Sequence, residues 1–223
     1  MNTFQNAAGK PVLLEIVKAI QDNKGYLGEV DGLIGDGDHG MNMSKGFRLF
    51  EERFGHKDFG FSEGLYELGV ILLNEIGGSM GPIYGTFFME AADSLENKES
   101  IGVKELKNML EASLHGIYEI VDARPGDKTL VDTLAPAVES LEESDNQGMD
   151  LEEALSAMKR AAKKGMESTK DLLARYGRSS RLGERSKGVL DAGAVSCNII
   201  LEALANGVIE IQSGGKNEIS NRL

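Results

Sequence analysis

The spacing of the apolar residues is the feature of this sequence that most restricts its fold. Between residues 150 and 176, apolar side chains recur at steps of three or four positions, which places them along one face of a helix. Asp150 and Glu153 form a capping pair at the start of this stretch. The stretch therefore predicts a long amphipathic helix with this buried face: Leu151, Leu155, Met158, Ala162, Met166, Thr169, Leu173 and Tyr176.

The same helical repeat continues through most of the chain. Pro136 is a candidate kink site in one of the predicted helices. No stretch shows the sustained alternation of a strand, so the sequence predicts an all-α domain of about eight helices joined by short loops. We expect this single domain to occupy residues 1–210 and a polar, frayed tail to follow at 211–223. The further predicted helices are 11–23, 42–54, 63–76, 82–96, 103–121, 128–143 and 194–205.

Composition excludes several classes of partner. The 223 residues include 24 basic and 36 acidic side chains, a net charge of -12 that would repel nucleic acid and anionic membranes. Cys197 is the single cysteine, so no intrachain disulfide forms, which suits a reducing compartment. The N-terminus lacks the pattern of a signal peptide, and no run approaches the roughly eighteen apolar residues of a membrane span. We expect a soluble cytoplasmic protein.

Glycine-rich segments separate the predicted helices. The chain has 28 glycines against 4 prolines, which indicates structured loops where the backbone comes close to another group. We expect these loops to meet at one end of a helical bundle. They are GDGDHG (35–40), GGSMGP (77–82), RPGDKT (124–129), GRSSRLGERSKG (177–188) and DAGA (191–194).

The first of these loops has the spacing G-x-G-x-x-G, but its variable positions are acidic. A carboxylate about 4 Å from a phosphate oxygen is repelled by roughly 4 kcal/mol at an effective dielectric near 20, so a bare dinucleotide loop is excluded. An EF-hand is excluded because Met41 and Phe47 occupy the positions of its glycine and glutamate. The remaining candidates are an acidic surface turn and a Mg²⁺ site with the ligands Asp31, Asp36 and Asp38.

The other loops carry features of anion sites. Pro82 stands at an expected first helical position after GGSMG, and free N–H groups at a helix start bind anions. Lys128 and Thr129 stand at another expected helix start, where Asp127 as a simple N-cap is the alternative. Segment 177–188 and its flank are basic in an otherwise acidic chain, through Arg175, Arg178, Arg181, Arg185 and Lys187. Ordinary turns and solvated loops remain the alternatives for each segment. Together, the loops favour a Mg-nucleotide site built without a Walker A motif.

Four long segments resemble, in order, the nucleotide-binding L subunit of dihydroxyacetone kinases. They are GDGDHGMNMSKGF, GGSMGPIYGTFF, PGDKTLVDTLAPAVESL and GRSSRLGERSKGVLDAGA. The related domain of fatty acid kinases has threonine after the second aspartate, where this chain has His39. The resemblance implies a closed barrel of eight antiparallel amphipathic helices with ADP or ATP bound in the loops at one end.

The resemblance also implies roles for individual residues. Asp31, Asp36 and Asp38 would hold Mg²⁺, Leu130 would help to form the adenine cleft, and Arg178 would be the catalytic residue that neutralises phosphate charge. The remaining nucleotide contacts implied by the family are His39, Gly40, Met41, Asn42, Ser79, Met80, Asp191, Ala192 and Gly193.

The implied reaction is transfer of a phosphoryl group to dihydroxyacetone, which a separate K subunit holds. Because no K domain is fused to this chain, we expect the form in which ADP stays bound and an M subunit of the phosphotransferase system is the phosphoryl donor. The alternatives are an ATP-dependent kinase subunit for another short ketose, such as erythrulose, and a nucleotide-loaded regulatory module. The sequence leaves open the ketose, the donor and the stoichiometry of the complex.

Overall fold

The computed structural model describes residues 3–220, and side-chain surroundings as far as residue 213. These residues form nine α-helices, two short 3₁₀ helices and two strands of two residues each, which confirms the predicted all-α class. The strands β1 (Phe4–Gln5) and β2 (Ser100–Ile101) pair antiparallel. The helices are η1 (Asn6–Ala8), α1 (Lys10–Asp22), α2 (Lys24–Ile34), α3 (His39–Phe54), α4 (Phe61–Glu75), α5 (Met80–Ser94), α6 (Val103–Ile120), α7 (Val131–Asn146), α8 (Leu151–Ser168), η2 (Arg178–Ser186) and α9 (Ala192–Ser220).

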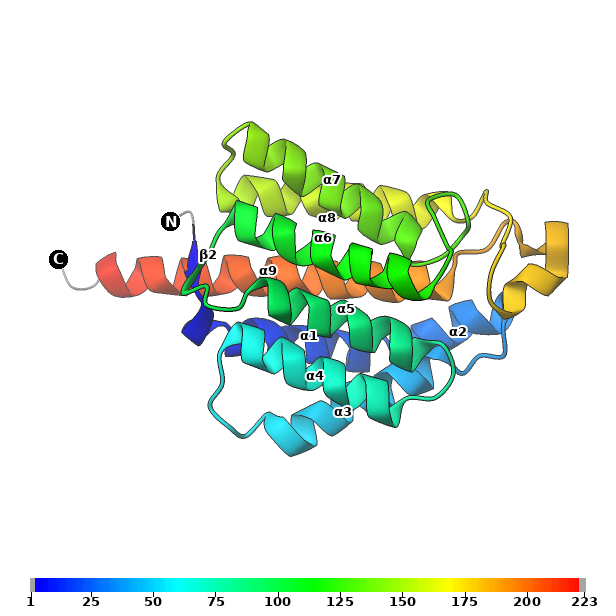
Figure 1. The fold of residues 1–223 in the computed structure, drawn as a ribbon, viewed down its shortest axis with the longest axis horizontal. Helices are drawn as coiled ribbons and strands as arrows, with labels where there is room; N and C mark the ends of the chain where they lie inside the picture. Colours follow the sequence, from blue (N-terminus) through cyan, green and yellow to red (C-terminus); the bar gives the residue numbers. More distant parts are fainter. Residues whose placement is uncertain (1–2, 221–223) are drawn as a thin grey trace.

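Eight of the α-helices form a closed ring. Helices α3 to α9 pack in sequence order, each against the next, and α1 closes the ring by packing against both α9 and α3 (Figure 1). Neighbouring helices run in opposite directions, which short connections favour. Helix α2 is additional to the ring and lies at one end of it, against α3, α9 and η2.

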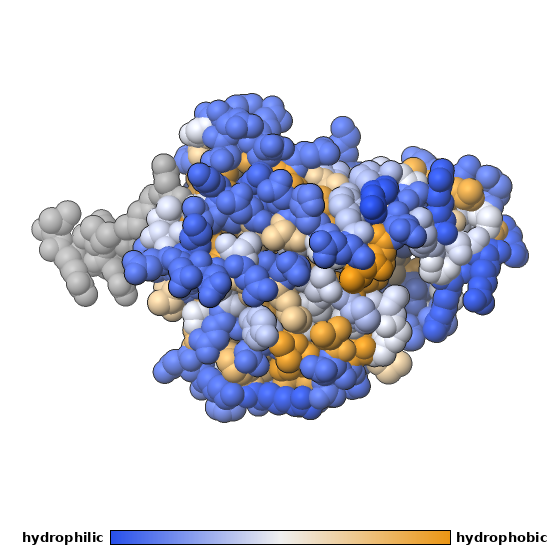
Figure 2. Space-filling model, in the orientation of Figure 1, coloured by the Kyte–Doolittle hydropathy of each residue, from blue (hydrophilic) through white to orange (hydrophobic). Residues whose placement is uncertain are grey.

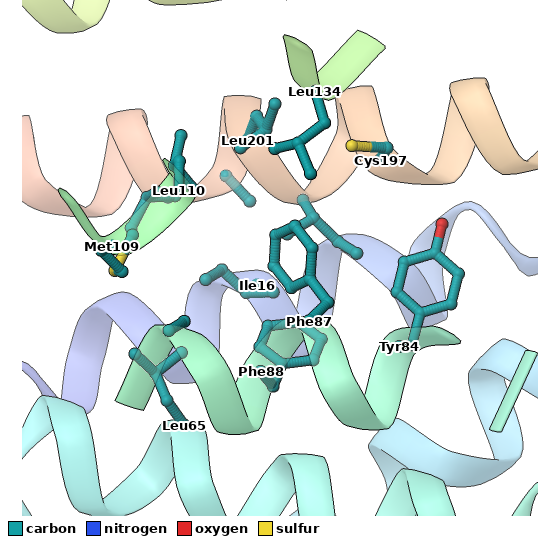
Figure 3. Close-up of a cluster of buried hydrophobic side chains, with 14 of the residues drawn as sticks. Ile16, Leu65, Tyr84, Phe87, Phe88, Met109, Leu110, Leu134, Cys197 and Leu201 are labelled. Carbon is teal, nitrogen blue, oxygen red and sulfur yellow. The ribbon is translucent and has the colours of Figure 1, made fainter. Parts of the chain in front are cut away.

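The inside of the ring is filled with apolar side chains from nearly every helix. Figure 3 shows Ile16 of α1, Leu65 of α4, Phe88 of α5, Leu110 of α6 and Leu201 of α9 meeting there, each at most 2% exposed. Aromatic rings interlock edge to face within this core. The predicted amphipathic faces therefore point where the helical repeat placed them.

The predicted boundaries fail at three places. Helix α2 was not predicted, because its glycines weaken the helical signal. Helix α8 ends at Ser168 rather than near 176, and Leu173 and Tyr176 are 37% and 41% exposed. Helix α9 continues to Ser220, through most of the expected tail. Gln212 of that stretch is 7% exposed and donates to the Thr3 carbonyl at 3.4 Å. Residues 221–223 of the expected tail lie outside the described residues.

One helix is apolar enough on average to cross a membrane, although its sequence contains interspersed polar residues. The stretch Ala192–Ser213 of α9 contains a window with a mean hydropathy of 1.5, and 72% of that window is buried inside the molecule. Burial explains this hydropathy, because α9 contacts α1, α7 and α8 in the ring. The face of the molecule in Figure 2 is mostly hydrophilic, with apolar residues gathered in a few separate patches.

Candidate functional site

All five glycine-rich segments lie at the same end of the ring. The connections α2–α3, α4–α5 and α6–α7, the segment around η2 and the start of α9 are together at the right of Figure 1. The two strands and the C-terminal part of α9 are at the opposite end. The expectation that these loops meet is therefore confirmed, and it follows from the alternating direction of the helices.

The three predicted metal ligands form one cluster at this end. Asp31 belongs to the last turns of α2, and Asp36 and Asp38 follow in the connection to α3. One carboxylate oxygen from each residue lies within 4.8 Å of the other two, and Asp36 is exposed. Carboxylate oxygens in an accessible loop can share a cation with water or phosphate oxygens. Mg²⁺ favours this combination of ligands.

Glycines allow this loop to fold tightly against α2. Gly37 has a φ of +76°, a conformation that disfavours other residues. A Cβ atom on Gly35 would lie 2.3 Å from an Asp31 carboxylate oxygen, so any side chain there would displace that ligand. A Cβ atom on Gly40 would lie 2.0 Å from the Lys24 carbonyl oxygen. The glycines are therefore needed for the position of the carboxylates.

Arg178 is the basic residue that reaches the acidic cluster. Its guanidinium pairs with Asp36 and lies 4.0 Å from Asp38. The pair is largely exposed to solvent, and exposed pairs contribute only about 0–1 kcal/mol. Arg178 can therefore move from the carboxylates to an arriving anion at little cost.

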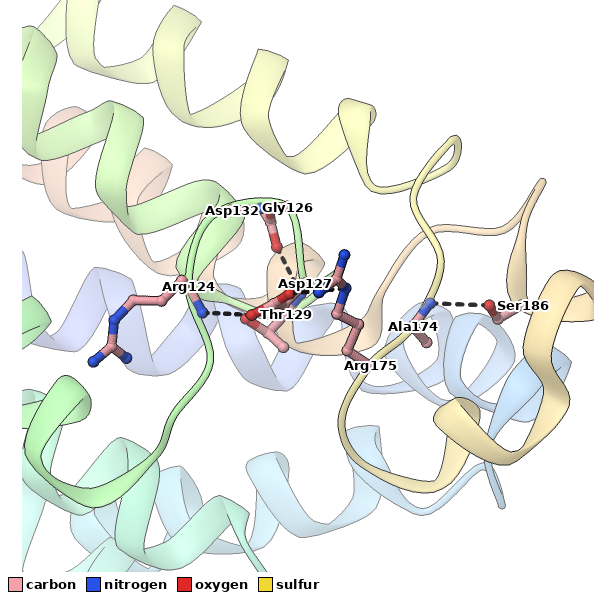
Figure 4. A network of polar contacts seen from close by, with 8 residues as sticks. All are labelled: Arg124, Gly126, Asp127, Thr129, Asp132, Ala174, Arg175 and Ser186. Carbon is pink, nitrogen blue, oxygen red and sulfur yellow. Dashed lines mark hydrogen bonds and ion pairs between the residues drawn. The ribbon is translucent and has the colours of Figure 1, made fainter.

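The other basic residues of this segment have different surroundings. Arg175 pairs with Asp127 of the α6–α7 connection at 3.2 Å (Figure 4), and Lys187 pairs with Glu184 at 2.9 Å. Within the described residues, Arg181 and Arg185 make no ion pair. The predicted basic cluster thus contributes one residue, Arg178, to the carboxylates.

A buried polar chain links the start of α3 to α5 and α9. The His39 Nε2 atom lies 2.8 Å from the Ser196 hydroxyl, which lies 2.5 Å from the Tyr84 hydroxyl. The Tyr84 hydroxyl also donates to the Gly193 carbonyl at 3.2 Å. Burial lowers the pKa of His39 to about 4, although the nearby Asp31 carboxylate opposes this shift. His39 is therefore neutral near pH 7 and brings no positive charge to the site.

The start of α9 contributes a half-buried carboxylate. Asp191 accepts the backbone N–H of Ala194 at 2.8 Å, and its own N–H donates to the Thr169 hydroxyl at 3.1 Å. Burial raises the pKa of Asp191 to about 6, while the Ala194 N–H and the Lys128 ammonium oppose the rise. Desolvation disfavours the charged form of an acid, so the ionised Asp191 carboxylate is less stable here than in water.

The α6–α7 connection is organised by a carboxylate that the sequence analysis did not single out. Asp132 accepts the N–H of Gly126 at 2.6 Å and that of Thr129 at 2.8 Å (Figure 4). Asp127, the alternative N-cap, instead accepts the N–H of Arg124. Lys128 is 1% exposed and its ammonium donates to the Thr169 and Val189 carbonyls, so it is not a free anion ligand at this helix start.

The remaining predicted nucleotide contacts are at the same end, with fewer mutual contacts. Ser79 is exposed just before α5, and Met80 packs against the core. Pro82 is in the first turn of α5, two positions later than expected. Met41 is 60% exposed at the start of α3, beside Asn42. Leu130 lies close to Gly193, where a Cβ atom would be 3.5 Å from the Leu130 nitrogen.

Three residues of this end escaped sequence reasoning: Tyr84, Ser196 and Asp132. Ser196 interrupts the apolar run 194–205, and Tyr84 and Asp132 stand one helical turn or less inside predicted helix starts. A polar group in a buried position is the signal that could have found them, because such groups need partners.

The chain matches a known protein family over most of its length. Residues 33–206 match the family described as the DAK2 domain. The chain is 40% identical over 183 residues to the "PEP-dependent dihydroxyacetone kinase, ADP-binding subunit DhaL" of Escherichia coli (strain K12), covering 81% of this chain and 86% of that protein. It is 34% identical over 186 residues to the "PTS-dependent dihydroxyacetone kinase, ADP-binding subunit DhaL" of Lactococcus lactis subsp. lactis (strain IL1403), covering 83% and 88%.

A solved structure shares the fold. The dihydroxyacetone kinase from C. freundii, solved in complex with AMP-PNP and Mg²⁺, superposes with a TM-score of 0.66 over 92% of this chain. The sequence identity is 24%, and this chain spans about a third (34%) of the length of that kinase chain. The similarity supports the closed helical barrel that the sequence resemblance implied.

Proposed function

This chain belongs to the DAK2 domain family, and from that premise we propose that it is the Mg-nucleotide-binding, phosphoryl-transferring subunit of a dihydroxyacetone kinase. The observation that supports this most directly is the cluster of Asp31, Asp36 and Asp38 facing Arg178. Carboxylates that hold a cation and a guanidinium that can contact phosphate are the two charges that phosphoryl transfer requires.

The three aspartates fit Mg²⁺ by the chemistry of their donor atoms. All three offer hard oxygen ligands within 4.8 Å of one another. Asp31, Asp36 and Asp38 would hold Mg²⁺, whose charge would offset the negative charge of a bound nucleotide. Without such a cation, the carboxylates would repel the phosphates, so the proposal ties nucleotide binding to magnesium.

The protein's own residues would then position the nucleotide. We propose that Arg178 leaves Asp36 to contact the transferring phosphoryl group, where its planar guanidinium can donate two hydrogen bonds at once. Because His39 is neutral, its imidazole adds no second positive charge to that of Arg178. Leu130 and Gly193 would border the adenine. The remaining proposed contacts are Gly40, Met41, Asn42, Ser79, Met80, Asp191 and Ala192.

We propose a K subunit as the partner that holds dihydroxyacetone. The two relatives described above are themselves named as ADP-binding subunits of such kinases. Both names include "ADP-binding" and one includes "PTS-dependent", which supports ADP and a phosphotransferase-system donor. We propose that the ADP is retained and that the donor is an M subunit of that system. We also propose a cytoplasmic location, since Cys197 is the single cysteine and the absence of an intrachain disulfide suits a reducing compartment.

The first experiment asks which nucleotide the purified protein carries. The protein is passed through gel filtration and denatured, and the released supernatant is analysed by ion-exchange chromatography. One ADP per chain supports the retained cofactor. An empty protein that binds ATP only with Mg²⁺ supports an exchanging, ATP-dependent kinase. A protein that binds neither nucleotide contradicts the proposed function.

Asp36→Ala tests the site itself. Loss of this ligand should abolish measurable Mg-ADP binding in calorimetry, because the remaining two carboxylates hold the cation poorly. Circular dichroism should be unchanged, since Asp36 is exposed and packs no core. Asp145→Ala, an exposed acid on α7, is the matched control and should bind as the wild type does. Tight Mg-ADP binding by Asp36→Ala would show that the nucleotide site lies elsewhere.

A further inference from the structure

Lys128 is a buried lysine in an uncommon backbone conformation. Its side chain is 1% exposed and its φ is +62°, a region that residues other than glycine rarely occupy. A glycine at this position would adopt the conformation without strain. Backbone strain of this kind persists only where the surrounding contacts maintain it. We therefore ask which contacts of the Lys128 side chain do so.

The ammonium group joins three segments that are distant in the sequence. It donates to the carbonyl of Thr169, just after α8, and to that of Val189, just before α9, the latter at 2.5 Å. Its own backbone belongs to the connection that leads into α7. The segment of Val189 continues into Asp191, whose N–H donates to the Thr169 hydroxyl. The buried Lys128 and Thr169 thus form one polar cluster with the half-buried Asp191.

The cluster includes one proposed nucleotide contact, Asp191, and is close in the sequence to two others. Leu130 follows Lys128 by two positions, and Gly193 follows Asp191 by two. Leu130 and Gly193 approach so closely that a Cβ atom on the glycine would lie 3.5 Å from the Leu130 nitrogen. A shift of the lysine would therefore move both sides of this contact.

We propose that Lys128 is a positioning residue for nucleotide binding, which fixes Leu130, Asp191 and Gly193 relative to one another through its buried ammonium group. This inference rests on the proposed function, since it assigns these three residues to the nucleotide site. It differs from a purely structural role because it requires the lysine to set the charge of Asp191 as well as the position of its backbone.

Electrostatics supports this coupling. Burial lowers the pKa of Lys128, while the negative charges of Asp191, Asp132 and Asp171 oppose this shift. In return, the ammonium opposes the rise in the pKa of Asp191 that burial causes, whereas Asp132 adds to it. Tyr84 of α5 also lies near Asp191, and its own pKa is raised by burial. Removal of the lysine charge should therefore shift Asp191 further toward its neutral form.

Lys128→Met tests the proposal, because methionine keeps much of the length but removes the charge and the donors. Lys164→Met, an exposed lysine on α8, is the matched control. Calorimetry should show Mg-ADP affinity at least tenfold weaker in Lys128→Met and within twofold of wild type in Lys164→Met. Carboxyl-carbon NMR without nucleotide should show the Asp191 titration midpoint raised by half a pH unit or more in Lys128→Met. An unchanged midpoint, or affinity within twofold of the control, overturns the proposal.

A second measurement uses the wild-type protein and does not depend on how the variant folds. The ¹⁵N resonance of the Lys128 ammonium is followed while Mg-ADP is added. Positioning predicts a shift that saturates with binding, whereas the Lys164 resonance stays constant. Binding without any change at Lys128 overturns the inference and leaves the proposed function intact. Absence of Mg-ADP binding by the wild type removes the proposed function, and the inference with it.

Discussion

At the scale of single residues, the candidate site holds charges in positions that the fold itself disfavours. The half-buried Asp191 has a pKa raised to about 6, from an ordinary value of 3.8, because burial penalises its charged form. His39 shows the opposite case of a base kept neutral by burial. Perturbed titratable groups of this kind gather at functional sites more often than elsewhere.

Asp191 predicts a pH dependence of stability with a definite sign. Between pH 3.8 and 6 the folded state holds a proton on Asp191 that the unfolded state has lost, so this residue's contribution falls as pH rises through that window. Relative to Asp191→Asn, the wild type should be more stable at pH 4.5 than at pH 7.5 by about 2 kcal/mol. Urea unfolding of both proteins at the two pH values measures this difference. A difference that does not change with pH would show that Asp191 titrates normally.

At the scale of elements, helix α2 shows how glycines can serve a helix that they weaken. Gly28 lies against the Gly37 carbonyl, and the start of α3 packs so closely on α2 that a Cβ atom on Gly40 would be 2.8 Å from the Gly28 nitrogen. This close approach places the loop that carries Asp36 and Asp38 between two helices. Packing therefore stabilises a helix whose intrinsic propensity is poor.

Two glycine substitutions separate packing from propensity. Gly40→Ala forces a methyl group against the Lys24 carbonyl, and overpacking of this kind typically costs about 1–3 kcal/mol. Gly25→Ala, on the exposed side of α2 with no atom within 4 Å, should be neutral or stabilise by up to about 1 kcal/mol. The free energy of unfolding, from denaturant titration, distinguishes them. Equal effects of the two substitutions would argue against the close α2–α3 contact.

At the scale of the whole molecule, the ring of helices gives the site a rigid base and one open end. The alternating direction of the helices brings every glycine-rich loop to that end (Figure 1). The proposed residues supply charges for a metal and for phosphates, but the acceptor hydroxyl is assigned to the partner. Catalysis on this plan depends on two proteins meeting at the open end.

The division of labour predicts the behaviour of the isolated chain. Loaded with Mg-ATP, or with ADP and a phosphoryl donor, the chain alone should produce no dihydroxyacetone phosphate from free dihydroxyacetone. Addition of a K subunit should start turnover, which a coupled assay of dihydroxyacetone phosphate measures. The Asp36→Ala chain with the same K subunit should remain inactive. Turnover without any partner would contradict the two-subunit mechanism, and none with a competent partner would favour a regulatory role.

Features that depend on local pattern could be predicted from the sequence. The apolar repeat placed most of the ring helices and their buried faces, and Asp150 was correctly expected to cap α8, where it accepts the N–H of Glu153. The spacing of Asp31, Asp36 and Asp38 on a glycine-rich turn indicated a cation site, and the structure brings their oxygens together. Such features need only a few neighbouring residues to be recognised.

Features that depend on residues distant in the sequence could be seen only in the folded structure. Helix α2 forms because another backbone packs against its glycines, and α8 ends early where Thr169 bonds to Asp191 and Lys128. Lys128 turns inward because two carbonyls from other segments accept hydrogen bonds from its ammonium group. Among the basic residues of the loop, the family resemblance singled out Arg178, and the structure adds that its guanidinium pairs with the Asp36 carboxylate. A periodic pattern reports which face of a helix is buried, whereas the partners of a polar group are set by the fold.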